Sequence, residues 1–201
     1  MSDTVELGIP GLALDVGDHV CAFYRGSDER DAILESYLVA GIRSGDKCVC
    51  VIDTGDPALL RSSLEDRCDL ASFRDGQLDV RVSQETYLRE GSFSAAAMLA
   101  FWEVVVGAAI GAGYPFSRAV GEMTWALRQM PGVEDLVEYE ANLNLFLPRF
   151  PQVILCLYDL ERFDGEILVD ILKTHPRVLV AGMVLDNPYY LEPAEFLASR
   201  R

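Results

Sequence analysis

Several apolar runs of the sequence stop at a polar or aromatic side chain. Each run is short and rich in apolar residues, which predicts a buried strand. In an open parallel sheet, ligands bind beyond the carboxyl ends of the strands. A strand also has to end in something polar, so a plain structural role stays open for each residue. The end residues that could line a pocket are Tyr24, Asp53, Glu122, Trp125, Tyr158 and Asp159.

A carboxylate and an amide interrupt an apolar helical stripe later in the chain. Over 133–147 the apolar residues recur at helical spacing, and Glu140 and Asn144 fall within that stripe. A carboxylate that faces a core is costly unless it is paired or hydrogen-bonded. Two interpretations stay open: a structural bond to an arginine or a tyrosine hydroxyl, or a ligand contact in the same pocket as Glu122.

The spacing of histidine and cysteine favours packing over chemistry. His19 and Cys21 share one face of a strand, as do Cys48 and Cys50, but neither pair has the C-x-x-C spacing of a zinc knuckle. Metal or haem ligation is the alternative to buried packing. His175 lies at a predicted helix end, and the sequence contains no G-x-S-x-G or H-E-x-x-H motif. We therefore expect no catalytic residue, no enzyme and no metal site, and the sequence identifies no cofactor.

The loop at 25–31 is acidic where a nucleotide-binding α/β protein would cradle phosphate. It holds Gly26 as its one glycine, no lysine, and acidic residues from Asp28 onward. A P-loop needs bare backbone amides and a lysine. We expect Asp28 to cap the following helix and the acids to repel phosphate, so ATP hydrolysis is not predicted.

Strand and helix patterns alternate along almost the whole chain, which predicts an α/β fold. A mainly parallel sheet would be flanked by helices on both faces, as a three-layer sandwich. Strands are predicted at 19–24, 47–53, 78–82, 118–123, 152–158 and 177–184, and helices at 29–43, from 57, 93–112, 131–148, 163–173 and after 193.

Charge and cysteine content restrict the partners and the compartment. The 201 residues carry 32 acidic and 17 basic side chains, a net charge of −15. This acidity disfavours direct contact with nucleic acid or an anionic membrane. The sequence shows no signal peptide, and its five cysteines are expected to be reduced and buried. We expect a cytoplasmic protein.

Six short segments follow one another over nearly the whole chain. They are GDHVCAFY at 17–24, GEMTWA at 121–126, YEANLN at 139–144, CLYD at 156–159, LKTHPR at 172–177 and NPYY at 187–190. Together they resemble the MEDS family, the methanogen/methylotroph DcmR-type sensory domain. The resemblance implies a RecA/KaiC-like domain without a P-loop. It also implies the sensing of small molecules, proposed to be hydrocarbon derivatives, in bacterial or archaeal signalling and transcription control.

The resemblance divides the chain into an N-terminal tail at 1–16 and a sensory domain at 17–201. Family members often carry this domain beside a DNA-binding or kinase-type module, and this sequence contains no such module. We therefore expect the output to pass through another chain, or the chain to be an excised or free-standing domain.

We predict a non-catalytic sensory domain that binds an organic, hydrocarbon-derivative-type ligand at the carboxyl edge of the sheet. The alternatives are a regulator of a partner kinase or anti-sigma factor, and a degenerate nucleotide-binding, ATPase-like domain. The expected partners are the ligand and a signalling protein, without direct nucleic-acid or membrane contact, and a homo-oligomer stays open. The predicted ligand-binding residues are His19, Tyr24, Glu122, Trp125, Glu140, Asn144, Tyr158 and Asp159.

Overall fold

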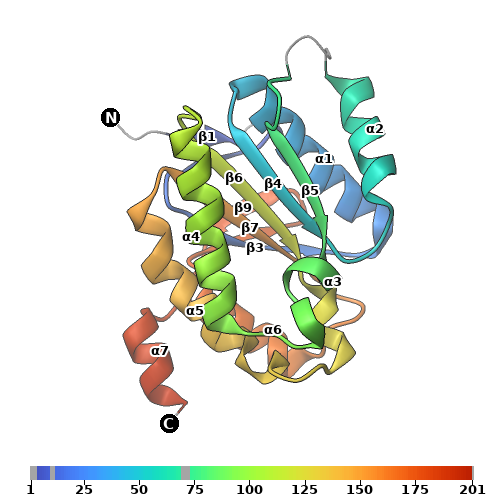
Figure 1. Cartoon of the computed structure of the whole chain (residues 1–201). Coiled ribbons are helices and arrows are strands. Elements are labelled where there is room, and N and C mark those ends of the chain that lie inside the picture. Colours follow the sequence, from blue (N-terminus) through green and yellow to red (C-terminus); the bar gives the residue numbers. More distant parts are fainter. Residues whose placement is uncertain (1–3, 10–11, 69–72, 201) are drawn as a thin grey trace.

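A seven-stranded sheet forms the centre of the molecule (Figure 1). The computed structural model describes residues 4–9, 12–68 and 73–200. The strand order is β5-β4-β6-β7-β3-β8-β9, and every neighbouring pair is parallel except β8 and β9. The α/β fold with a mainly parallel sheet is confirmed. The strands are β3 (His19–Tyr24), β4 (Lys47–Ile52), β5 (Leu78–Val82), β6 (Ser117–Glu122), β7 (Gln152–Asp159), β8 (Arg177–Val180) and β9 (Met183–Asp186).

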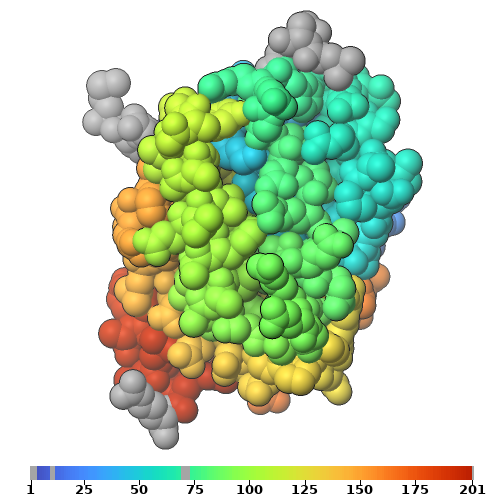
Figure 2. Space-filling model, in the orientation of Figure 1, coloured from blue at the N-terminus to red at the C-terminus, as the bar shows by residue number. Residues whose placement is uncertain are grey.

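Helices cover both faces of this sheet and make the three layers. Helices α1 (Gly26–Ser44) and α2 (Pro57–Arg67) pack on one face. Helices α4 (Ala95–Gly111), α5 (Leu136–Phe146) and α6 (Gly165–Thr174) pack on the other. Figure 2 shows α4 and the green segment that follows β5 covering much of this second face. The shorter elements are α3 (Ser83–Thr86), α7 (Pro193–Ser199) and the 3-10 turns η2 (Arg89–Gly91), η3 (Met123–Arg128), η4 (Val133–Asp135) and η5 (Leu147–Arg149).

Alternation along each strand sends neighbouring residues into different hydrophobic cores. On β3, Cys21 and Phe23 belong to the core under α4–α6, whereas Ala22 and Tyr24 belong to the core under α1 and α2. Successive side chains of a strand point to opposite faces of a sheet. A one-residue difference in position therefore decides which helices a side chain meets.

The N-terminal segment packs onto the domain. Strands β1 (Thr4–Glu6) and β2 (Ala13–Asp15) form an antiparallel pair. Leu7 and Leu14, within and beside this pair, are buried in the core under α1 and α2. The described part of the segment expected as a tail thus contributes apolar side chains to that core.

Two expected elements differ from the structure. The run predicted as one strand at 177–184 is the antiparallel pair β8 and β9, because Ala181 (φ 49°) and Gly182 (φ 73°) are both left-handed and reverse the chain. The helix predicted from 131 starts at Leu136, after the turn η4. Gly132 has φ 85°, and a Cβ there would lie 2.1 Å from the Phe93 carbonyl oxygen.

The acidic start of α1 also differs in detail. The helix begins at Gly26, and Asp28 lies in its first turn instead of capping it. The Glu29 carboxylate accepts a 2.7 Å hydrogen bond from the Arg25 backbone N–H. Across the ranges described, no helix combines the length and the apolar character needed to cross a bilayer.

Candidate functional site

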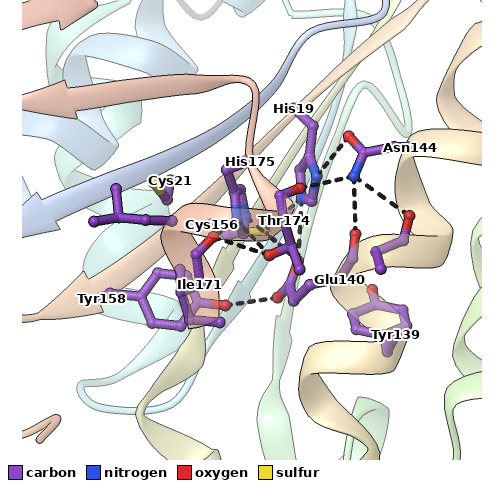
Figure 3. Close-up of polar contacts among 12 residues, drawn as sticks. His19, Cys21, Tyr139, Glu140, Asn144, Cys156, Tyr158, Ile171, Thr174 and His175 are labelled. Atoms are coloured by element: carbon purple, nitrogen blue, oxygen red, sulfur yellow. Dashed lines mark hydrogen bonds and ion pairs between the residues drawn. The ribbon is translucent and has the colours of Figure 1, made fainter. Parts of the chain in front are cut away.

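Six polar side chains meet between the sheet and helices α5 and α6 (Figure 3). They come from β3, α5, β7 and the residue that follows α6. All except one, the part-buried Asn144, are at most 2% exposed. We call this group the histidine cluster: His19, Glu140, Asn144, Cys156, Tyr158 and His175.

The local structure explains how these residues meet. Strands β3 and β7 are parallel neighbours, and Cys21 lies opposite Cys156. His19 precedes Cys21 by two residues, so it points to the same face as Cys156. Glu140 and Asn144 lie one turn apart on α5 and share a helix face. His175 is the C-cap residue of α6.

Glu140 is the centre of the cluster. Its Oε1 accepts a 2.7 Å hydrogen bond from the Tyr158 hydroxyl. Its Oε2 lies 3.1 Å from His19 Nε2, 3.5 Å from His175 Nε2 and 3.6 Å from Cys156 Sγ. The bond to a tyrosine hydroxyl, which was one of the two interpretations of this carboxylate, is present in the structure.

Burial controls the protonation of the cluster. Removal from water lowers the pKa of His19 and of His175 to about 3 and raises the pKa of Glu140. It also raises the pKa of the Cys156 thiol, and the Glu140 charge raises it further. Both imidazoles are therefore neutral near pH 7.

The contacts of the ring nitrogens assign the tautomer of one of the two histidines. His19 Nδ1 lies 3.2 Å from Asn144 Oδ1, and His175 Nδ1 lies 2.8 Å from the Ile171 carbonyl oxygen. A neutral imidazole has one N–H, and on His175 it belongs on Nδ1, which faces the carbonyl oxygen. The Nε2 lone pair of His175 then points toward Glu140, and within the described chain this nitrogen has no hydrogen-bond partner. His19 has an oxygen near each ring nitrogen, Asn144 Oδ1 at Nδ1 and Glu140 Oε2 at Nε2.

One donor atom from each of four residues lies close enough for a shared metal ion. The relevant atoms of His19, Glu140, Cys156 and His175 all lie within 4.8 Å of one another. Sequence reasoning selected His19 and Glu140 and missed Cys156 and His175. The only signal for these two was their place in the segments CLYD and LKTHPR, because their separation along the chain fits no metal motif.

A second polar group, which we call the strand-end cluster, lies at the carboxyl ends of β4 and β6. Glu122 Oε2 accepts hydrogen bonds from the backbone N–H groups of Asp53 (2.7 Å) and Thr54 (2.9 Å). Its Oε1 accepts from Thr54 Oγ1 (2.6 Å) and Arg30 Nη1 (3.2 Å). Asp53 in turn accepts from Thr124 Oγ1 (2.8 Å). The Arg128 guanidinium also donates to Asp53. The strand-end cluster thus consists of Arg30, Asp53, Thr54, Glu122, Thr124 and Arg128.

A pocket of about 330 Å³ adjoins the strand-end cluster, between α1 and α2. Arg30 and Thr54 belong to both the pocket lining and the cluster. Glu122 lies behind these two side chains and is 2% exposed. The apolar part of the lining comprises Leu34, Ile52, Leu59 and Leu60.

Glu122 and Glu140 do not share a pocket, so that part of the expectation is wrong. Glu122 is two residues from Val120 and points to the α1/α2 face, whereas Glu140 contacts Cys156 on the α4–α6 face. The sheet separates the two carboxylates. They belong to two sites of different character, one fully buried and one beside an open pocket.

The other predicted site residues divide between the edge of the sheet and the core. Tyr24 and Asp159 are paired in register at the ends of β3 and β7, and burial together with the charges of Glu122 and Asp159 raises the pKa of Tyr24. Trp125 is fully buried and stacks on Tyr87 at 4.7 Å between ring centroids. The rings of Tyr24, Trp125 and Tyr158, which were predicted from the sequence as ligand-binding residues, do not line the pocket beside Thr54.

Comparison with protein families gives one match over most of the chain. The profile of MEDS, the "MEthanogen/methylotroph, DcmR Sensory domain", matches residues 18–176. The transcriptional repressor DcmR of Methylorubrum extorquens is 29% identical over 180 residues, which is 87% of this chain and 64% of that protein. The chain thus spans less than two thirds of that relative's length.

Two solved structures share the fold. A KaiC-like protein from Pyrococcus horikoshii superposes with a TM-score of 0.63 at 17% identity, covering 89% of this chain and 80% of that one. The flagellar accessory protein FlaH from Methanocaldococcus jannaschii gives a TM-score of 0.58 at 10% identity, covering 92% and 84%. The RecA/KaiC-like architecture is confirmed.

Proposed function

Because this chain belongs to the MEDS family of sensory domains, we propose that it is a non-catalytic sensor of a small organic molecule that binds beside the strand-end cluster. Family membership and the similarity to a transcriptional repressor support a sensory role in signalling or transcription control. The ligand class that we propose is a hydrocarbon derivative with one polar group. The signal would pass to a protein partner.

The observation that carries this proposal is the pocket between α1 and α2. Its volume of about 330 Å³ suits a small molecule, and it lies at the carboxyl end of β4. Binding sites of this kind combine an apolar lining with a few polar groups that orient the ligand. Leu34, Ile52 and Leu60 supply the apolar surface, and Arg30 and Thr54 supply the polar contacts.

The strand-end cluster gives such a ligand a route to the rest of the domain. Arg30 and Thr54 hold Glu122, which also accepts the backbone N–H groups of Asp53 and Thr54. A ligand that bonds to Arg30 or Thr54 competes with Glu122 for their donors. It thereby favours one arrangement of the loop at 53–56 over another, which is sufficient for signalling without catalysis.

The test is a thermal-shift screen of the whole chain. The panel contains short alkyl halides, alcohols, amines and carboxylates, with haem, flavins and nucleotides as further arms. A ligand at 100 times its Kd stabilises the folded state by about 2.7 kcal/mol, or roughly 5–10 °C in Tm for a chain of this size. Stabilisation by a short hydrocarbon derivative supports the proposal. Stabilisation only by ATP or GTP, with hydrolysis, would replace it by a nucleotide-binding function.

A matched pair of variants locates the binding site. Leu60→Trp places a large ring in the pocket lining, whereas Leu145→Trp makes the same change at an exposed position on α5. We expect the first variant to abolish the ligand-induced shift and the second to keep it. Equal shifts in both variants would place the ligand elsewhere, and no shift by any compound with an intact fold would refute the sensor proposal.

A further inference from the structure

We propose that His19, Glu140, Cys156 and His175 form a binding site for one Zn²⁺ ion inside the histidine cluster. The inference is independent of the ligand pocket, because the two sites lie on opposite faces of the sheet. Two imidazole nitrogens, one carboxylate oxygen and one sulfur are donors that Zn²⁺ accepts, and four of them complete its tetrahedral shell.

The distances between the donor atoms fit a tetrahedron. Zinc bonds of about 2.0–2.3 Å at tetrahedral angles place neighbouring donors about 3.3–3.6 Å apart. Four of the six separations are 3.1 Å (His19 Nε2 to Glu140 Oε2), 3.5 Å (His19 Nε2 to Cys156 Sγ), 3.5 Å (His175 Nε2 to Glu140 Oε2) and 3.6 Å (Cys156 Sγ to Glu140 Oε2). The remaining pairs are within 4.8 Å. The donors need only small shifts to surround one ion.

The Nε2 lone pair of His175 already points into the cluster. His175 Nε2 is fully buried and has no hydrogen-bond partner among the described residues. With its proton on Nδ1, it presents a bare lone pair to the Glu140 carboxylate at 3.5 Å. Two acceptors that face each other in a low-dielectric interior are unfavourable. A cation between them removes the conflict.

A set of outer hydrogen bonds holds the donors in place. Asn144 orients His19 through Nδ1, and the Ile171 carbonyl orients His175 in the same way. Tyr158 occupies the second carboxylate oxygen of Glu140 and leaves Oε2 toward the centre (Figure 3). In metal sites the imidazole commonly donates its other N–H to such a carbonyl or carboxylate partner. Each histidine of the cluster has a carbonyl oxygen within hydrogen-bond distance of Nδ1, where such an N–H would be donated.

The charges of the site balance when the ion is bound. Coordination requires the Cys156 thiolate and the Glu140 carboxylate, and the protons that these groups release go to solvent. One Zn²⁺, two single negative charges and two neutral imidazoles sum to zero. A neutral assembly avoids the large desolvation cost of an unpaired buried charge. The donors are at most 2% exposed, so the ion is best introduced while the chain folds.

The experiment loads the intact chain by refolding from urea under reducing, anaerobic conditions with Zn²⁺ or Co²⁺. After exhaustive desalting, elemental analysis counts Zn²⁺ per chain, and absorption reports the Co²⁺ environment. We expect one ion per chain, a thiolate-to-Co²⁺ charge-transfer band, and the visible bands of a tetrahedral ion. Less than a tenth of an ion per chain would overturn the proposal and leave a hydrogen-bonded network that shares a proton.

Two cysteine variants distinguish the site from adventitious binding. Cys156→Ser removes one donor, and Cys50→Ser makes the same change at a buried cysteine on β4, in the other core. We expect Cys156→Ser to lose the charge-transfer band and to bind Zn²⁺ at least about 100-fold more weakly. Loss of a residue that only hydrogen-bonds to a metal ligand typically weakens metal binding by about 10- to 100-fold, and loss of a ligand itself should have a larger effect. Cys50→Ser should match the parent protein. Equal affinity in both variants refutes the assignment, and if either fails to fold, the Co²⁺ spectrum of the parent decides.

Discussion

Replacement of Glu122 by glutamine tests the reasoning about the strand-end cluster. The side chain is 2% exposed and accepts two backbone N–H groups, one hydroxyl and one guanidinium. Glutamine keeps the shape but carries one amide nitrogen, which donates. The least costly orientation leaves its oxygen on the N–H groups of Asp53 and Thr54 and turns its NH₂ toward Thr54 Oγ1 and Arg30.

The magnitude follows from the loss of charge. Hydrogen bonds to charged groups contribute about 1.5–3 kcal/mol, against about 0.5–1.5 for neutral ones. The two retained backbone bonds therefore weaken by about 1 kcal/mol each, and the Arg30 guanidinium loses its acceptor in Glu122. We expect Glu122→Gln to lower the free energy of unfolding by about 3 kcal/mol, or about 6–12 °C in Tm for a chain of this size.

The assay is urea unfolding at neutral pH, followed by circular dichroism and tryptophan fluorescence. Glu103→Gln is the matched control, because Glu103 is half exposed and pairs with Arg149 at 2.5 Å on the surface. Exposed pairs contribute about 0–1 kcal/mol, so the control should stay close to the parent. A loss below about 1 kcal/mol in Glu122→Gln, or one equal to the control, would refute a buried charge-assisted role for Glu122.

Three further predictions concern the cores and the thiols. Gly121→Ala should reduce stability by about 1–3 kcal/mol in urea unfolding, because the added Cβ would lie 2.3 Å from the Tyr87 hydroxyl oxygen; a neutral effect would mean that this ring moves freely. Arg118→Leu should cost about 3–5 kcal/mol in the same assay, because it strips the 2.6 Å partner from the buried Asp46 carboxylate; adding Asp46→Leu should restore part of that loss, and no restoration would contradict the pairing argument. In metal-free protein, all five buried cysteines should resist a disulfide-exchange reagent in native buffer and react only as the chain opens; reaction as fast as that of an exposed thiol would contradict their burial.

The sequence determined the order and type of most elements. The β-branched runs at 47–52 and 152–158 and the capping and turn residues between them predicted buried strands alternating with helices, and the structure has both strands. Such patterns depend on neighbours within a few residues, so they can be read locally. The sequence analysis did not predict the chain reversal at Ala181 and Gly182, because apolar residues continue on both sides of it. The two left-handed residues are not flanked by the polar residues that usually mark a turn.

Only the tertiary structure decided which polar residues meet. Strand order and register place His19 of β3 beside Cys156 of β7, although 137 residues separate them. Alternation along the strands then sends Glu122 to one face of the sheet, while Glu140 on α5 packs on the other. Sequence reasoning placed both carboxylates in one pocket because it located strand ends but not the faces. The histidine cluster exists because separate crossover connections bring four elements to one point, and no local pattern encodes that coincidence.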